Sequence, residues 1–413
     1  MALAILMTLF LVGLSIFQSI YVFEFCRAVR SHAATLLQDE QCPTAAVIVC
    51  VRGKDPSLEK CIQSLIDQDY PNYKIFLVVD SLADPAFHVA KEFEASHSGR
   101  IEILILDQPK KTCSLKCSSL IQAYQQLDSQ VKIIAQLDTD TIPERNWLRH
   151  LASELNDENV GVVSGIRWYR PRKDNLGSIV RTIWNSAAIV QMYWYDIAWG
   201  GSLAMKREVI EETELLDRWS VAFCEDTMIS DTLVGTRWKF KTGLRLFVYN
   251  SESTGLSELT AWISRQLITT RLHHSKWWLV LGHALATSLS VLTTLLYIPV
   301  LAIQQNFLPA IGLLFVLVAY QFNNWVNLFA LEHCERKLEN DEPHPPAINL
   351  FSIQFLLALL VTQSIHFVAT VKAILTRRVH WRGIEYQLER NGSVVMKEYR
   401  VYDAVNEKQT HSI

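Results

Sequence analysis

Three uncharged apolar stretches constrain this chain more than any other feature of its sequence. Residues 2–23 carry no charged side chain, and residues 277–331 and 348–371 carry none apart from His283 and His366. A helix of about 20 apolar residues, rising about 1.5 Å per residue, crosses a bilayer core of roughly 30 Å. The middle stretch is long enough for two crossings. The sequence therefore predicts one N-terminal span and up to three C-terminal spans.

We interpret the first stretch as an uncleaved anchor, because no basic segment precedes it and it exceeds the apolar core of a signal peptide. Arg27 and Arg30 follow it, so the next domain is expected in the cytoplasm. Three further spans would leave the C-terminus outside, whereas Lys372, Arg377 and Arg378 favour the inside. The conflict disappears if one apolar stretch is re-entrant or interfacial, and the sequence leaves that choice open.

Between these stretches the composition is that of a globular protein. A net charge of -3 over 413 residues gives no reason to expect nucleic-acid binding. The eight cysteines form neither a disulfide framework nor a paired CxxC metal site. The predicted units are a transmembrane anchor (1–30), a globular domain (31–255), an amphipathic interface helix (256–276), transmembrane helices (277–375) and a polar tail (376–413).

Short β-rich apolar runs alternate with helical patterns in the first part of the globular domain. This alternation predicts an α/β fold with a mostly parallel sheet, whose ligands bind at the carboxyl ends of the strands. Asp80 ends the second run, and Asp138 and Asp140 end the fourth, so these carboxylates are expected to face one crevice. The predicted strands are 45–51, 74–79, 101–106 and 131–137, and the helices between them are 57–67, a segment ending at Phe93, and 118–127.

Two acidic pairs are candidates for chemistry. Asp138 and Asp140 are spaced so that both can reach a hard cation such as Mg²⁺ or Mn²⁺, which prefers carboxylate and phosphate oxygens. A solvated acidic turn is the alternative. Glu225 and Asp226 could supply a carboxylate that removes a proton from a hydroxyl group, or could simply be acids placed at a helix start. The sequence of either pair alone does not show which of its two interpretations is correct.

A third candidate lies on the amphipathic segment directly before the second apolar stretch. Arg265, Gln266 and Arg271 lie there within two helical turns. Arginine binds phosphate through its planar fork. A basic face resting on anionic headgroups is an equal alternative.

Eight short segments occur in an informative order. They are AVIVCVRG (46–53), CIQSLIDQDYP (61–71), VVDS (78–81), CSLK (113–116), LDTDT (137–141), GGSLA (200–204), EDT (225–227) and VHWRGIEY (379–386). Together they resemble glycosyltransferase family two, whose members have the GT-A fold (a Rossmann-like domain), here joined to transmembrane helices. Within that family the chain looks most similar to membrane-bound ceramide-glucosyltransferase-type enzymes.

The resemblance implies roles for individual residues of the globular domain. Asp80 resembles the aspartate that binds the nucleotide base or ribose. Lys116 resembles a lysine that approaches the diphosphate. Asp138 and Asp140 resemble the DxD that binds nucleotide and metal, with the metal at Asp140. Asp226 resembles the general base.

Further roles are implied for the glycine turn and the amphipathic helix. The turn of Gly200, Gly201 and Ser202 would let the backbone approach the donor sugar or the acceptor. Arg265, Gln266 and Arg271 would contact the diphosphate. The chain departs from the family here, because the (Gln/Arg)xxRW motif is replaced by RQLITTR at 265–271, which lacks the tryptophan that lies under the acceptor.

The sequence thus predicts a metal-dependent, inverting glycosyltransferase in the membrane, with a cytoplasmic catalytic domain. It would use Mn²⁺ or Mg²⁺ to transfer a sugar from a nucleotide-sugar, a UDP-hexose, to a lipid acceptor. Asp226 would deprotonate the acceptor hydroxyl for a single displacement. The alternatives are a processive polysaccharide synthase, which the missing tryptophan disfavours, and a catalytically inactive membrane scaffold.

Overall fold

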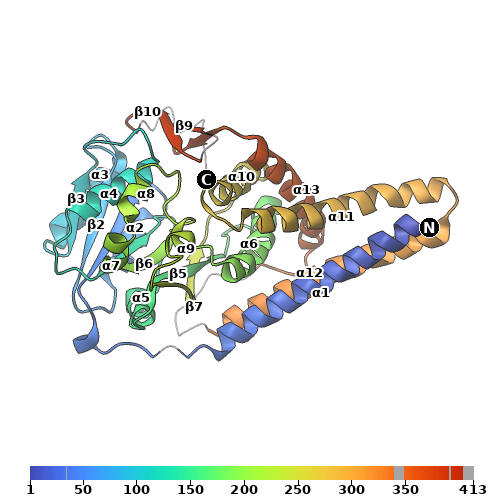
Figure 1. Cartoon of the computed structure of the whole chain (residues 1–413), viewed down its shortest axis with the longest axis horizontal. Helices are drawn as coiled ribbons and strands as arrows, with labels where there is room; N and C mark the ends of the chain where they lie inside the picture. Colours follow the sequence, from blue (N-terminus) through green and yellow to red (C-terminus); the bar gives the residue numbers. More distant parts are fainter. Residues whose placement is uncertain (34, 339–347, 390–391, 403–413) are drawn as a thin grey trace.

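The computed structural model describes residues 1–33, 35–338, 348–389 and 392–402, and shows an α/β part from which long helices extend (Figure 1). The strands of its main sheet are β1 (Ala45–Val51), β2 (Tyr73–Val79), β3 (Ile101–Ile105), β4 (Ile133–Leu137), β5 (Val160–Tyr169), β6 (Ser202–Lys206) and β7 (Lys239–Asn250). They lie in the order β3-β2-β1-β4-β6-β5-β7. The first four are parallel, β6 is antiparallel to both of its neighbours, and β7 is parallel to β5. The predicted α/β class with a mostly parallel sheet is confirmed.

The first four strands lie where the sequence predicts them, since central parallel strands are continuous apolar runs. The helices between them are α2 (Leu58–Ile66), α3 (Pro85–Ser96) and α4 (Leu115–Gln125). Helix α4 begins earlier than predicted, because the side chain of Ser114 caps it by accepting a hydrogen bond from the N–H of Cys117 (3.2 Å). This cap places Lys116 in the first helical turn, at the edge of the sheet where β4 ends.

The second half of the domain contains a long helix that the sequence pattern did not predict. Helix α6 (Leu176–Tyr195) begins at Asn175, whose side chain accepts a hydrogen bond from Ser178 N–H (2.8 Å), and ends at Asp196 in the left-handed conformation (φ 57°). It contacts β5, α1, α10 (Leu256–His273) and α13 (Ile353–Leu375). A helix packed on several sides shows little amphipathic periodicity. The shorter helices are α5 (Trp147–Leu155), α7 (Arg207–Glu212), α8 (Leu215–Trp219) and α9 (Ile229–Thr232).

Four helices are long and apolar enough to cross a membrane, as predicted: α1 (Ala2–Ser31), α11 (Trp277–Ile303), α12 (Phe307–Arg336) and α13. In Figure 1, α1, α11 and α12 extend away from the sheet, and the N-terminus lies near the turn that joins α11 to α12. There Ala4 packs with Leu301 and Ala310.

Helix α13 differs from the other three. It starts next to the middle of α12, where the indole N–H of Trp325 donates to the carbonyl of Leu350 (3.1 Å). It ends at α10, where the guanidinium of Arg271 donates to the carbonyl of Ala373 (2.5 Å). Helix α13 therefore extends from the middle of α12 to α10 and lies apart from the α11–α12 turn.

The chain then returns to the α/β part as a three-stranded sheet of β8 (Arg378–Trp381), β9 (Ile384–Leu388) and β10 (Val394–Glu398). The N–H of Met396 donates to the carbonyl of Lys111 (2.7 Å), and the hydroxyl of Tyr386 accepts from Leu115 N–H (3.1 Å). Because the chain leaves and rejoins the same domain, the number of complete crossings between these points is even. We therefore expect α11 and α12 to cross and α13 to be the re-entrant or interfacial segment.

A buried ion network joins the sheet to α12. Arg170, directly after β5, donates to Glu332 (2.5 Å) and also pairs with Glu335. The hydroxyl of Tyr249 on β7 donates to Glu335 (2.8 Å). Arg170 is 1% exposed, so this contact is shielded from water and fixes the sheet against the helix.

Candidate active site

A cavity of about 1090 Å³ connects the carboxyl end of the sheet with the long helices. Asp138 and Asp140, which follow β4, line its polar end, and so does Asp226. Asp80, which was expected to face the same crevice, is not among the described residues that line it. Lys116 lines the same end. The opposite end is formed by residues of α1, α6, α11, α12 and α13.

Lys116 lies at the centre of the acidic groups. Its ammonium group is 2.7 Å from Asp138 and 2.7 Å from Glu225, and 3.4 Å from the carbonyl of Gly200. Burial lowers the pKa of Lys116, but these carboxylates and that of Asp226 raise the pKa well above its usual range. Burial likewise raises the pKa of Asp138, and the charge of Lys116 reverses this effect, so that its pKa is lowered. Lys116 and Asp138 are therefore a charged pair at neutral pH.

Asp226 is held by two donors at the glycine turn. Gly200 N–H donates to one carboxylate oxygen (2.6 Å) and the thiol of Cys224 to the other (2.7 Å). Burial, followed by the charges of Asp226 and Glu225, raises the pKa of Cys224 well above its usual range, so the thiol keeps its proton. A Cβ at position 200 would lie 2.0 Å from a carboxylate oxygen of Glu225. Glycine is therefore required here so that the backbone can approach the two acids.

Asp140 faces the cavity among other carboxylates. The amide of Asn250 donates to it (2.8 Å). Burial, with the nearby charges of Asp138, Glu252 and Asp55, raises the pKa of Asp140 to about 7. Converging hard oxygen donors whose charges repel one another are the donor set that a divalent cation fits. Cys224, Glu225 and Asp226 also lie within 4.8 Å of one another, but the ammonium of Lys116 already occupies that side.

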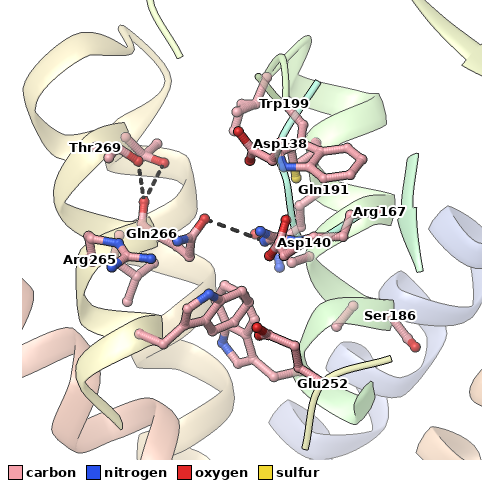
Figure 2. Close-up of a pocket in the computed structure, with 18 of the residues that line it drawn as sticks. Asp138, Asp140, Arg167, Ser186, Gln191, Trp199, Glu252, Arg265, Gln266 and Thr269 are labelled. Carbon is pink, nitrogen blue, oxygen red and sulfur yellow. Dashed lines mark hydrogen bonds between the residues drawn. The ribbon is translucent and has the colours of Figure 1, made fainter. Parts of the chain in front are cut away.

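Two arginines face these acids from other elements. Arg167 on β5 donates to the side chain of Gln266 on α10 (3.4 Å), and Arg265 precedes Gln266 on the same helix (Figure 2). Burial, with the charges of Arg382 and Arg167, lowers the pKa of Arg265 to about 10. In the described part of the chain neither Arg167 nor Arg265 forms an ion pair with a carboxylate. The two guanidinium groups can therefore accept an anion.

Five predicted site residues, Asp80, Gly200, Gly201, Ser202 and Arg271, are not among the described residues that line the cavity. The carboxylate of Asp80 pairs with Arg52 and accepts from the hydroxyl of Tyr399 (3.0 Å). Arg271 caps the end of α13, and the hydroxyl of Ser202 accepts from the indole N–H of Trp147 (2.8 Å). Their predicted contacts with donor or acceptor stay predictions, while their present partners are structural.

Sequence reasoning missed several residues that line the polar end. Arg167 lies in a strand that carried no motif, and Asp55 and Glu252 lie in loops. Trp381 and Arg382 belong to the C-terminal segment that resembled the family, but the segment alone gave no sign of where it docks.

The membrane end of the cavity is lined by apolar and uncharged polar side chains. The amide of Gln191 on α6 and the ring of His283 on α11 are hydrogen-bonded (2.9 Å). Gln363 on α13 also lines the cavity, and its side-chain oxygen has no partner within the described residues. A hydrogen-bonding ligand that enters between the helices would thus meet neutral partners.

Parts of this chain are similar in sequence to known proteins. It is 26% identical over 125 residues to glycosyltransferase AglE of Haloferax volcanii, covering 30% of this chain and 39% of that protein. It is 38% identical over 61 residues to a ceramide glucosyltransferase of Komagataella phaffii, covering 15% of this chain and 12% of that protein. The chain thus aligns with less than half of the length of either relative.

One solved structure is similar over nearly its whole length. The mannosyltransferase PcManGT from Pyrobaculum calidifontis, in complex with GDP-Man and Mn²⁺, superposes with a TM-score of 0.50 at 16% identity. The match covers 91% of this chain and 98% of that one. At this identity the likeness shows the fold alone, and it confirms the predicted GT-A architecture.

The model of a protein family described as glycosyl transferase family 21 matches residues 6–394, nearly the entire chain. The sequence resemblance named family two. The predicted glycosyltransferase class is confirmed, whereas the matching model is that of family 21. The chain therefore belongs to glycosyltransferase family 21.

Proposed function

We propose that this protein transfers one sugar from a nucleotide-sugar, a UDP-hexose, to a hydroxyl group of a membrane lipid, with inversion, at the cytoplasmic face. The observation that carries the proposal is the continuous cavity. It begins at Asp140 and Asp226 and ends between helices of membrane-spanning length. A nucleotide-sugar and a lipid can therefore meet in one enclosed space.

The polar end suits the donor. Asp140, supported by Asp138 and Asn250, would hold Mn²⁺ or Mg²⁺, and a bound cation neutralises the charge of a leaving diphosphate. The presence of Mn²⁺ in the PcManGT complex supports this assignment. Arg265 and Gln266 would bind the remaining phosphate oxygens, since guanidinium groups suit phosphate geometry.

Asp226 suits the general base. Two donors fix its carboxylate, and it lines the polar end of the cavity. It would accept the proton of the lipid hydroxyl while that oxygen attacks the anomeric carbon from the side opposite the diphosphate. A single displacement of this kind inverts the anomeric configuration.

The membrane end suits a lipid acceptor. Apolar side chains from five helices would bury the hydrocarbon chains, and the uncharged groups around Gln191, His283 and Gln363 would bind a hydroxylated headgroup. The similarity of one segment to a ceramide glucosyltransferase supports a lipid acceptor.

The test uses the full chain purified in detergent, a panel of nucleotide-sugars with Mn²⁺, and a membrane lipid extract. Release of nucleoside diphosphate and the mass of the lipid product are measured. We expect a lipid heavier by one hexose. A ladder of long glycans would instead indicate a processive synthase, and no turnover with any donor would indicate an inactive scaffold.

A matched pair of variants tests the acceptor path. Ala187→Trp places a large ring in the cavity from α6, whereas Ala319→Trp lies exposed on α12 outside the cavity. We expect Ala187→Trp to lose transfer to lipid while slow hydrolysis of the donor continues, and Ala319→Trp to behave as the parent. Equal effects of both variants would contradict the assigned path.

A further inference from the structure

The turn between β8 and β9 brings a distant part of the chain into the polar end of the cavity. Trp381 and Arg382 both line it. The side chain of Arg52, which follows β1, donates to the carbonyl of Arg382 (2.7 Å) and so fixes the turn against the main sheet. The turn is therefore a wall of the site, although α11, α12 and α13 separate it from the DxD motif in the sequence.

The backbone of this turn is unusual. Arg382 has φ 48° and Gly383 has φ 73°. Two successive residues with positive φ form the tight hairpin turn that usually contains Asn-Gly or Gly-Gly. An arginine in the first of these positions is strained, and strain of this kind concentrates at functional sites.

Trp381 contacts Phe223, three residues before Asp226, and Arg265 on α10. Its ring meets Phe223 edge to face, with 5.6 Å between the ring centroids. The guanidinium of Arg265 lies over the same ring at 5.4 Å. A cation held over an indole face is oriented and attracted by the ring. Trp381 thus fixes Arg265, which begins the stretch 265–271 that has no tryptophan.

Arg382 points toward the acids. Its guanidinium lies 3.6 Å from the carboxylate of Asp55. Burial lowers its pKa, but Asp55, Asp140, Glu252 and Asp138 outweigh burial and raise it. The charge is therefore retained at the mouth of the DxD site.

Three guanidinium groups thus converge opposite the DxD motif, from β5, from α10 and from the β8–β9 turn. Arg382 and Arg167 both disfavour the charged form of Arg265. Like charges gathered in a cavity are stabilised by an anion that all of them can contact. A nucleoside diphosphate held by a cation at Asp140 has such phosphate oxygens.

We propose that the β8–β9 turn completes the donor site: Arg382 binds the terminal phosphate of the nucleoside diphosphate, and Trp381 positions Arg265 for the same group. This inference rests on the proposed use of a nucleotide-sugar. It assigns to the C-terminal turn the aromatic group that residues 265–271 lack, together with a further cation.

The test compares Arg382→Gln and Arg382→Lys with the control Arg378→Gln. Arg378 is the first residue of β8, the strand that leads into the turn, and its side chain is 68% exposed. Affinities for UDP and UMP, and for GDP and GMP, are measured with Mn²⁺ by calorimetry on the full chain. We expect Arg382→Gln to lower the affinity for the diphosphates roughly 10- to 100-fold, because one charge-assisted contact is lost. The affinity for the monophosphates should fall much less.

The diphosphate affinity of Arg382→Lys should lie between those of the parent and Arg382→Gln, since lysine keeps the charge but loses the planar guanidinium fork. Unchanged diphosphate affinity in Arg382→Gln, or an equal loss for mono- and diphosphates, would overturn the inference. Tighter Mn²⁺ binding with unchanged diphosphate affinity would also overturn it, since Arg382 would then be only a counter-ion of the acids. If the parent chain bound no nucleoside diphosphate at all, the proposed function would fail together with the inference.

Trp381 is a positioning residue and needs a different measurement. Trp381→Ala should raise the donor KM roughly tenfold with a smaller change in kcat, and Trp381→Phe should restore most of the affinity because a ring face remains. An equal fall in kcat in both variants, with the donor KM unchanged, would contradict the positioning role.

Discussion

Replacing Asp226 with asparagine separates chemistry from binding. Asparagine has the same shape and keeps an oxygen for the N–H of Gly200, but it cannot take a proton from a hydroxyl group. Lys116 retains Asp138 and Glu225, each at 2.7 Å. The variant should therefore fold, with a change in stability of about 1 kcal/mol from weakened charge-assisted hydrogen bonds.

The expected loss is in turnover. Removal of a general base lowers rates by roughly 10²- to 10⁴-fold, which corresponds to about 2.7–5.4 kcal/mol in the activation barrier. The affinity for nucleoside diphosphate should stay within about threefold of the parent, because this carboxylate contributes no phosphate contact. Asp217→Asn, an exposed aspartate on α8, is the matched control.

The assay follows release of nucleoside diphosphate with a saturating lipid acceptor, together with calorimetric binding of the same nucleotide. Glu225→Gln provides the contrast. Glu225 is 1% exposed and pairs with Lys116, so its loss should lower stability more than turnover. If Asp226→Asn turned over normally while Glu225→Gln stayed folded and inactive, the general base would be Glu225 and not Asp226.

Three further outcomes are expected. Chelation should abolish transfer and Mn²⁺ or Mg²⁺ should restore it, whereas full activity in excess chelator would exclude the metal role of Asp140. Since the pKa of Asp140 without metal is raised to about 7, protons compete with the cation, so metal affinity should rise with pH up to about pH 7 and then level off. Calorimetric titration with Mn²⁺ between pH 5.5 and 8 tests this, and a flat profile would contradict it. Arg170→Met removes the Arg170 cation from the buried carboxylates of Glu332 and Glu335 and should lower stability by about 3–5 kcal/mol, measured by thermal unfolding against the exposed control Arg218→Met on α8.

The half of the sheet formed by β1 to β4 could be predicted because its signals are local. These strands are mostly apolar runs, and the DxD pair directly follows the last of them. The parallel-sheet rule was enough to bring Asp138 and Asp140 to the cavity. Strand β7 was missed because its exposed and buried residues alternate irregularly at the sheet edge.

The rest of the site depends on long-range docking. The contact between Arg52 and Arg382 joins the start of the sheet to a turn beyond every membrane helix, and no local pattern encodes such a pairing. The same docking places Tyr399 on Asp80. Sequence analysis could therefore find the acids and the α10 arginine, whereas the β8–β9 turn and Arg167 emerge only once the C-terminal sheet is packed.

The buried contact of Arg170 with Glu332 and Glu335 mechanically couples helix α12 to the end of β5. A membrane thinner or thicker than the apolar length of α12 changes the tilt of that helix. Through Arg170 the tilt acts on the end of β5, and the same strand carries Arg167 into the donor end of the cavity. Under the proposed function, lipid composition would act on the protein twice: as the source of the acceptor, and through the tilt of α12 as a load on the strand that carries Arg167.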